Sequence, residues 1–155
     1  MKENIELIQI IKDLLESQYF GILSSIQKDG SPYCNIIGFA AADNLESIIF
    51  ATPRKSRKYI NMMGEPRVSL LIDNRTNHEN DFLDATAVTI LGEAREADKT
   101  LERNMVEIYR KRHPQLGEFA LSESSALMEV RVDTYCYVSR FQDVACLKIE
   151  RNSRQ

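Results

Sequence analysis

The spacing of hydrophobic residues changes once along the chain, near residue 19. Before this point apolar side chains recur at helical spacing, at Leu7, Ile8, Ile11, Leu14 and Leu15. This spacing predicts an amphipathic helix over about residues 3–18, with charged side chains on its opposite face. Beyond it, short apolar runs are separated by turn residues, which is the pattern of β-strands.

The rest of the chain is predicted to form seven or so short strands and two further helices. Expected strands are 19–26, 33–42, 47–52, 67–73, 86–94, 127–137 and 144–149, and expected helices are about 54–63 and 98–113. The polar segment 74–83 is interpreted as a loop. Many short strands with few helices predict a mainly β protein, namely an antiparallel β-barrel with flanking helices. We expect one domain over residues 1–155, with the barrel over about 19–150.

Composition narrows the possible partners and the location. Charged residues make up 28% of the chain and the formal net charge is -3, so nothing draws the protein as a whole toward nucleic acid. No apolar run approaches the roughly 20 residues of a membrane helix, and the N-terminus lacks a signal-peptide pattern. We therefore expect a cytoplasmic protein with no nucleic-acid partner and no membrane partner.

The cysteines and histidines indicate neither a disulfide framework nor a metal site. The three cysteines, Cys34, Cys136 and Cys146, are odd in number and lack a CxxC spacing. They are interpreted as buried thiols in a reducing compartment. The two histidines, His78 and His113, have no second ligand at a recognisable spacing, so no bound metal is predicted.

The segment from Phe50 to Lys58 carries the clearest functional signal. A predicted strand ends here and delivers two hydroxyls and four cations to the start of a helix. Free backbone N–H groups at a helix start, together with Arg and Lys side chains, bind phosphate monoesters. The alternative is a solvated basic face, although cations at a helix start oppose the helix dipole. Physical chemistry alone leaves both interpretations open.

Short motifs follow one another in a particular order through this region. Thr52 is followed by Ser56-Arg57-Lys58 and then by the run from Glu65 to Leu71. This order resembles the flavin-binding core of the pyridoxamine 5'-phosphate oxidase family, over roughly residues 15–95. The resemblance implies an antiparallel split β-barrel that binds flavin mononucleotide (FMN). It also implies a homodimer with the cofactor at the subunit interface.

The same resemblance assigns cofactor-binding roles to particular residues. It implies that the phosphate of FMN is held by Thr52, Ser56, Arg57 and Lys58, with Ala51 beside them. It also implies that the flavin lies against the strand that contains Asn35, Ile36 and Ile37. These positions are the predicted cofactor-binding residues.

Departures from the family pattern argue against vitamin B6 as the substrate. Asn35 stands where the oxidase has arginine, Ala40 where it has lysine, and Ala87 where it has glutamine. The oxidase also ends with an Arg and His motif, whereas this chain has no histidine after His113. We therefore expect a relative of the oxidase that does not itself oxidise pyridoxamine phosphate.

Several residues of the second half point to a different cofactor. Tyr109, His113-Pro114, Phe119 and the segment 137–141 resemble the haem-utilisation branch of the same fold. This likeness implies haem as the lesser alternative to FMN, with His78 or His113 as the available imidazole ligand. His113 precedes a proline at a predicted helix end, where exposure or capping would explain it without a ligand.

Flavin chemistry shapes the expected function. A flavin carries the electron chemistry itself, so no catalytic side chain is nominated. We expect a flavin-dependent oxidoreductase that acts on a small molecule. No GxGxxG follows a strand, so a nicotinamide or deazaflavin electron donor would visit the site instead of residing there. The alternatives are a non-enzymatic flavin-binding or redox-sensing module, and a nucleic-acid binder, which the net acidity opposes.

Overall fold

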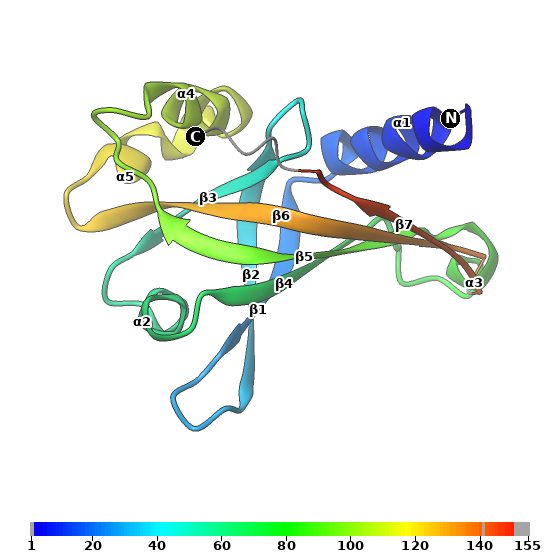
Figure 1. Ribbon diagram of the computed structural model, residues 1–155, viewed down its shortest axis with the longest axis horizontal. Coiled ribbons are helices and arrows are strands. Elements are labelled where there is room, and N and C mark those ends of the chain that lie inside the picture. Colours follow the sequence, from blue (N-terminus) through cyan, green and yellow to red (C-terminus); the bar gives the residue numbers. More distant parts are fainter. Residues whose placement is uncertain (1, 141, 151–155) are drawn as a thin grey trace.

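The computed structural model describes residues 2–140 and 142–150 and consists of β-strands surrounded by short helices (Figure 1). The strands are β1 Phe20–Ile26, β2 Pro32–Ala41, β3 Ser47–Pro53, β4 Arg67–Asp73, β5 Ala87–Glu96, β6 Ser125–Ser139 and β7 Asp143–Lys148. The helices are α1 Lys2–Ser17, α2 Arg57–Gly64, α3 Asp81–Asp84, α4 Arg103–Arg112, η1 Pro114–Leu116 and α5 Gly117–Leu121. The mainly β class is therefore confirmed.

The strands form one antiparallel sheet that closes on itself. Their order is β3-β2-β1-β4-β5-β6-β7, and β3 also pairs with β6. Within the described residues six strands thus make a closed barrel, while β7 lies outside it against β6. The predicted antiparallel barrel is confirmed. Strand β6 is long enough to pair with β3 through its first half and with β7 through its second half.

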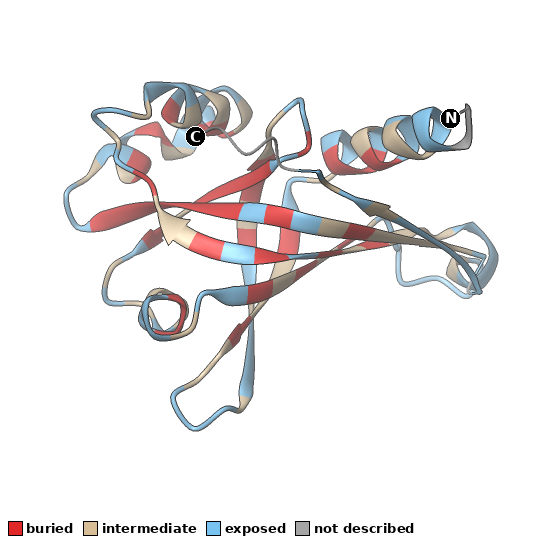
Figure 2. Ribbon diagram, in the orientation of Figure 1, coloured by how far each residue is buried: buried red, intermediate tan, exposed pale blue. Residues whose placement is uncertain are grey.

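Alternating side chains fill the barrel. In β4 and β5 the inward residues Leu70, Ile72, Val88 and Ile90 are at most 1% exposed. Figure 2 shows these buried positions recurring along the strands between exposed ones, as expected for a sheet with one face on the core. Helix α1 adds its apolar side, where Ile11 is fully buried. No helix in the described part of the chain is long and apolar enough to span a bilayer.

Two predicted helices begin later than the sequence pattern indicated, because capping decides their first residue. Helix α2 begins at Arg57 and not near residue 54, since the Ser56 hydroxyl accepts a hydrogen bond from the Tyr59 backbone N–H at 3.2 Å. Helix α4 begins at Arg103 and not at residue 98, since the Asp98 carboxylate holds the following residues in a turn.

Two short segments also form helices that the pattern did not predict. Helix α3 falls at the end of the segment interpreted as a loop, and η1, which begins at Pro114, is followed directly by α5. None of these segments is long enough to show a helical hydrophobic period, which is why they were missed.

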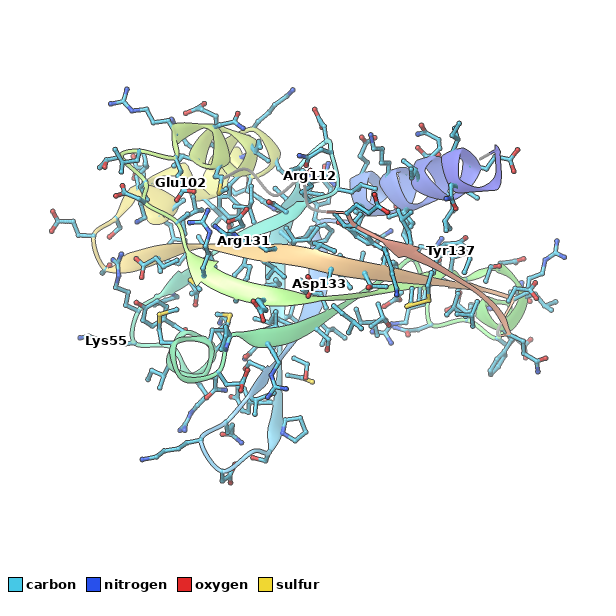
Figure 3. The ribbon with its side chains drawn as sticks, in the orientation of Figure 1. Lys55, Glu102, Arg112, Arg131, Asp133 and Tyr137 are labelled. Carbon is cyan, nitrogen blue, oxygen red and sulfur yellow. A yellow bond between two sulfur atoms is a disulfide. The ribbon has the colours of Figure 1, made fainter. Side chains whose placement is uncertain are left out.

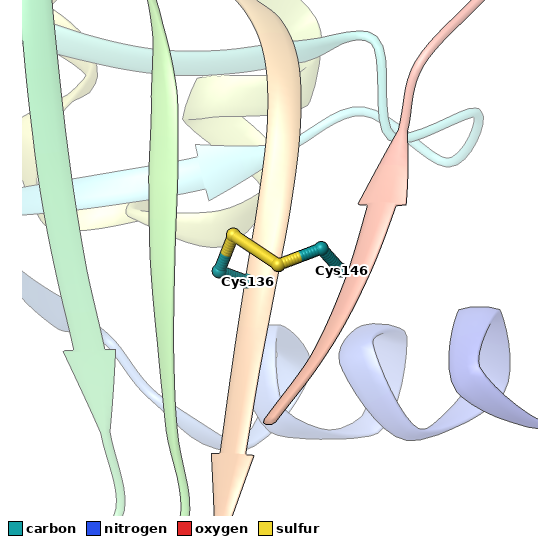
Figure 4. The surroundings of a disulfide bond; sticks show 2 residues. All are labelled: Cys136 and Cys146. Carbon is teal, nitrogen blue, oxygen red and sulfur yellow. A yellow bond between two sulfur atoms is a disulfide. The ribbon is translucent and has the colours of Figure 1, made fainter.

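The cysteines were predicted to be buried thiols, and this prediction is wrong. Cys136 on β6 and Cys146 on β7 stand directly opposite each other, with Cα atoms 4.2 Å apart, and form a disulfide (Figure 4). Cys34 on β2 is a free thiol, and it is exposed. The pair arises from the register of two neighbouring strands, which neither the cysteine count nor the spacing along the chain indicates.

Gly92 allows a close approach of β5 and β6. The register between these strands shifts at Leu91 and Gly92. A Cβ atom at Gly92 would lie 2.3 Å from the backbone carbonyl oxygen of Arg131. Because backbone cannot swing aside as a flexible side chain would, glycine is required here by contact and not by its backbone angles.

We expect Gly92→Ala to lower the free energy of unfolding by about 1–3 kcal/mol, because the added methyl group forces the two strands apart. Urea denaturation followed by circular dichroism measures this loss. The matched control is Gly64→Ala at the exposed end of α2, where a Cβ atom would have no neighbour within 4 Å. A Gly92 variant as stable as the Gly64 variant would contradict the argument.

Candidate functional site

The barrel wall is split between β2 and β3. In the described chain these two strands pair only through Phe39–Ala41 and Ile48–Phe50. The earlier part of β2 continues to pair with β1, and the later part of β3 continues to pair with β6. The two strands therefore diverge, and each presents a backbone edge to the opening. We call these two strand edges the lips of the opening. The predicted residues Asn35, Ile36 and Ile37 lie on the β2 lip, and Ala51 and Thr52 lie on the β3 lip.

Two rings from α4 and the residue after it hydrogen-bond to backbone groups of β3 and β2, the first at the edge that faces the opening and the second on the β1 side of β2. The Tyr109 hydroxyl oxygen accepts a hydrogen bond from the Ala51 backbone N–H. The His113 Nε2 donates to the Phe39 carbonyl oxygen at 2.7 Å. One helical turn separates the two residues, and their ring centroids are 5.0 Å apart. We call this pair of contacts the α4 clasp.

The α4 clasp is buried, so of the two explanations offered for His113, exposure and capping at a helix end, exposure is wrong, while His113 is the C-cap of α4. Tyr109 is 1% and His113 2% exposed. Burial raises the pKa of Tyr109, and the Ala51 N–H opposes that shift. Gly38 leaves room for the imidazole, since a Cβ atom there would already lie 3.5 Å from the His113 ring.

Two residues predicted to bind phosphate lie together between the end of β3 and the start of α2. The Thr52 and Ser56 hydroxyl oxygens are 2.8 Å apart and share a hydrogen bond. Thr52 is fully buried at this end of the barrel, and Ser56 is the N-cap of α2. The structure therefore brings these hydroxyls together at the positive end of a helix dipole.

The cations of the segment do not act as one group. Arg57 is exposed and Lys58 is half-buried, and neither forms an ion pair with any described residue. Burial lowers the pKa of Lys58, with no carboxylate beside it to offset the lost hydration. Lys55 points away from the barrel into solvent (Figure 3). Arg54 turns in another direction and pairs with Glu96.

The predicted flavin-facing residues are divided between two faces of β2. Ile37 is buried toward the barrel interior, whereas Ile36 is 73% exposed on the outer face. Successive side chains of a strand point to opposite faces, so these three residues cannot all present side chains to one ligand. Asn35 faces inward, and its buried Oδ1 has no hydrogen-bond partner among the described residues. An oxygen in this situation is an acceptor available to a ligand.

A second polar cluster beside α2 was not predicted. Glu96 on β5 accepts a hydrogen bond from the Tyr59 hydroxyl at 2.7 Å and pairs with Arg54. Burial alone would raise the pKa of Glu96, but these two partners hold it below its usual range. Lys99 donates to the carbonyl oxygens of Ser122 and Ser125 at 2.7 and 2.6 Å. These groups are far apart in sequence, and only the basic run around Arg54 gave any sign of them.

The chemistry available at this end of the barrel is anion capture. The hydroxyls of Thr52 and Ser56, the N-terminus of α2 and the unpaired ammonium of Lys58 all favour a phosphate group. The inward Oδ1 of Asn35 supplies an acceptor for an N–H donor. Five cavities of the described chain, of about 210–720 Å³, are lined by other residues, and we call Thr52, Ser56, Lys58 and the start of α2 the cradle.

Fold and site together define a split β-barrel with an anion cradle at the end of one strand. The family model for pyridoxamine 5'-phosphate oxidase matches residues 7–139. The chain therefore belongs to the pyridoxamine 5'-phosphate oxidase family. No curated protein matches the sequence.

Solved structures with the same fold are distant in sequence. A haem-binding protein from Mycobacterium smegmatis has a TM-score of 0.81 at 12% identity, over 91% of this chain and 57% of its own. The haem storage protein of Vibrio cholerae has a TM-score of 0.70 at 13% identity, over 90% and 92%. General stress protein 26 of Bacillus anthracis has a TM-score of 0.70 at 23% identity, over 93% and 99%. At these identities the likeness concerns the fold, and this chain spans little more than half of the first protein.

We expect Tyr109→Phe to lower the free energy of unfolding by about 1–3 kcal/mol, because the buried Ala51 N–H loses its partner while the ring volume is kept. Urea denaturation checks this value. Tyr33→Phe removes the same hydroxyl from a ring that is 37% exposed and should leave stability unchanged. Equal stabilities of the two variants would show that the contact between Tyr109 and the Ala51 N–H does not stabilise the protein.

Proposed function

We propose that this protein binds FMN at the split of its barrel and uses it as a flavin-dependent oxidoreductase on a small molecule. One observation carries the proposal: a half-buried cation, Lys58, lies unpaired among the described residues, at the start of a helix whose cap hydroxyl is bonded to that of Thr52. The phosphate of FMN supplies the missing anion.

The ring of the cofactor would occupy the opening between the lips. Asn35 Oδ1 is an unused acceptor on one lip, and the flavin ring system carries an N–H donor. When bound, the flavin supplies the electron transfer, so the protein needs to position the ring and admit a substrate. Because flavin chemistry needs no acid or base side chain from the protein, the proposal assigns no catalytic residue.

A homodimer would complete the cradle. The outer face of β1, β2 and β5 carries the large apolar residues Phe20, Ile36 and Leu91, which are 67%, 73% and 45% exposed. A second copy on this face would remove them from water and would form a wall over the split beside Ile36. The resulting site lies between subunits and admits a visiting electron donor.

The proposed substrate is not pyridoxamine phosphate. Asn35, Ala40 and Ala87 replace the arginine, lysine and glutamine of the oxidase pattern, and Ala40 is 3% exposed. A buried alanine offers no polar group to a substrate, so nothing at position 40 replaces the lysine of the oxidase pattern.

Haem is the second candidate cofactor, and the structural neighbours favour it. Two proteins with this fold are a haem-binding and a haem storage protein. Against it, the imidazole of His113 is engaged with the Phe39 carbonyl oxygen inside the α4 clasp. His78 is exposed on the segment before α3 and is the other available imidazole.

We expect Lys58→Gln to raise the dissociation constant for FMN about ten- to hundredfold, because a charge-assisted hydrogen bond contributes about 1.5–3 kcal/mol. Titration of flavin fluorescence measures the constant. Ser56→Ala should weaken binding less, since a neutral hydrogen bond contributes about 0.5–1.5 kcal/mol.

The matched control for this experiment is Lys55→Gln, which removes the same charge from a side chain that points into solvent. FMN affinity should be unchanged in this variant. An equal loss in both variants would indicate general charge attraction, and no loss in either would overturn the cradle. A parallel titration with haem, read from its visible absorption, identifies the second candidate if only haem binds.

A further inference from the structure

The last two strands carry a covalent link at a place that the proposed flavin site does not use. Cys136 and Cys146 are direct cross-strand partners in the β6–β7 ladder, between the pairs Thr134–Lys148 and Val138–Val144. Their disulfide spans a sequence separation of 10. The register alone therefore holds both sulfur atoms together, whether or not they are bonded.

This disulfide is accessible to reagents in solution. Cys146 is exposed, as are its neighbours from Asp143 to Ala145. Leu147 packs against the core, so by strand alternation the disulfide lies on the other face of β7. In Figure 4 it stands on the near face of the strands, with α1 behind them. No other described strand pairs with the outer edge of β7.

The same strand has few other attachments. Among the described strands β6 is its sole neighbour. Beyond the ladder, the Ile149 backbone N–H donates to the Asp133 carbonyl oxygen at 2.9 Å. Leu147 and Ile149 form one wall of a cavity of about 470 Å³, and Ile8 and Lys12 of α1 form another. A change in the mobility of β7 therefore changes how α1 packs against it.

We propose that Cys136–Cys146 is a reversible thiol–disulfide exchange site whose reductant is a dithiol, and that its oxidation state sets how firmly β7 is held. A thiolate of the dithiol attacks the Cys146 sulfur, the bond between the two cysteines breaks, and Cys136 leaves as a thiolate. The second thiol of the reductant then attacks the mixed disulfide and releases Cys146. The pair gains two electrons and two protons, and the dithiol is oxidised to a disulfide.

The barrel itself does not depend on this bond. A link that closes a short loop restricts the unfolded chain less than one that closes a long loop. The six barrel strands are joined by their own ladders, and β7 lies outside them. Reduction therefore frees an edge strand and leaves the fold in place.

The test uses the whole protein, equilibrated without denaturant in reduced or oxidised dithiothreitol. The protein is then unfolded and its free thiols are alkylated. Mass spectrometry counts the alkylated cysteines and locates them in the sequence. We expect one reactive thiol per chain, Cys34, in the oxidised protein and all three after reduction, with recovery on reoxidation. Hydrogen exchange should become at least about tenfold faster in β7 on reduction and stay unchanged in β4 and β5.

Two variants make the result specific. Cys34→Ser should keep both the redox response and the faster exchange. Cys136→Ser combined with Cys146→Ser should show rapid β7 exchange in both buffers. Three thiols in both buffers, one thiol in both buffers, or β7 exchange that ignores reduction would each overturn the proposal. Should the double variant fail to fold, the reduced wild-type protein still decides the outcome.

Discussion

A hydrogen bond from a helix, and not from a neighbouring strand, satisfies the edge of β3 where the barrel divides. Strands β2 and β3 part after a short ladder, and buried backbone groups left unpaired there would cost free energy. The Tyr109 hydroxyl satisfies one such group, the Ala51 N–H on β3, whereas His113 bonds the Phe39 carbonyl group on the β1 side of β2. Because the two rings come from one helical turn, α4 is bonded to β2 and to β3 at once. The rest of the site depends on this arrangement.

Two polar groups at this end of the barrel have no partner among the described residues. Asn35 Oδ1 is an acceptor without a donor, and Lys58 is a cation without an anion among the described residues. The first needs a hydrogen-bond donor and the second a negative charge. A flavin with a phosphate tail carries both, at opposite ends of one molecule. These two groups are the observations on which the proposal of FMN depends.

Local patterns predicted much of this molecule, and their failures share a cause. Strand alternation and helical spacing depend on neighbours in sequence, so the barrel, the first helix and the run from Thr52 to Lys58 could be predicted. The disulfide, the α4 clasp and the Glu96 cluster depend on which strands become neighbours in space. His113 illustrates this, since its sequence context indicated a helix end but not the carbonyl group that accepts its hydrogen bond.

The length of β6 sets the distance between the cradle at one end of the molecule and the disulfide at the other. Its first residues lie opposite Thr52, where Ala126 is the partner, and Cys136 follows ten positions later. An extended strand advances about 3.3 Å per residue, so about 33 Å of backbone separates the cradle from the cysteines. No direct electrostatic or steric influence spans that distance at physiological salt. Any energetic coupling between cofactor and cysteines would have to pass through the barrel as a whole, and without it the two would behave as independent equilibria on one scaffold.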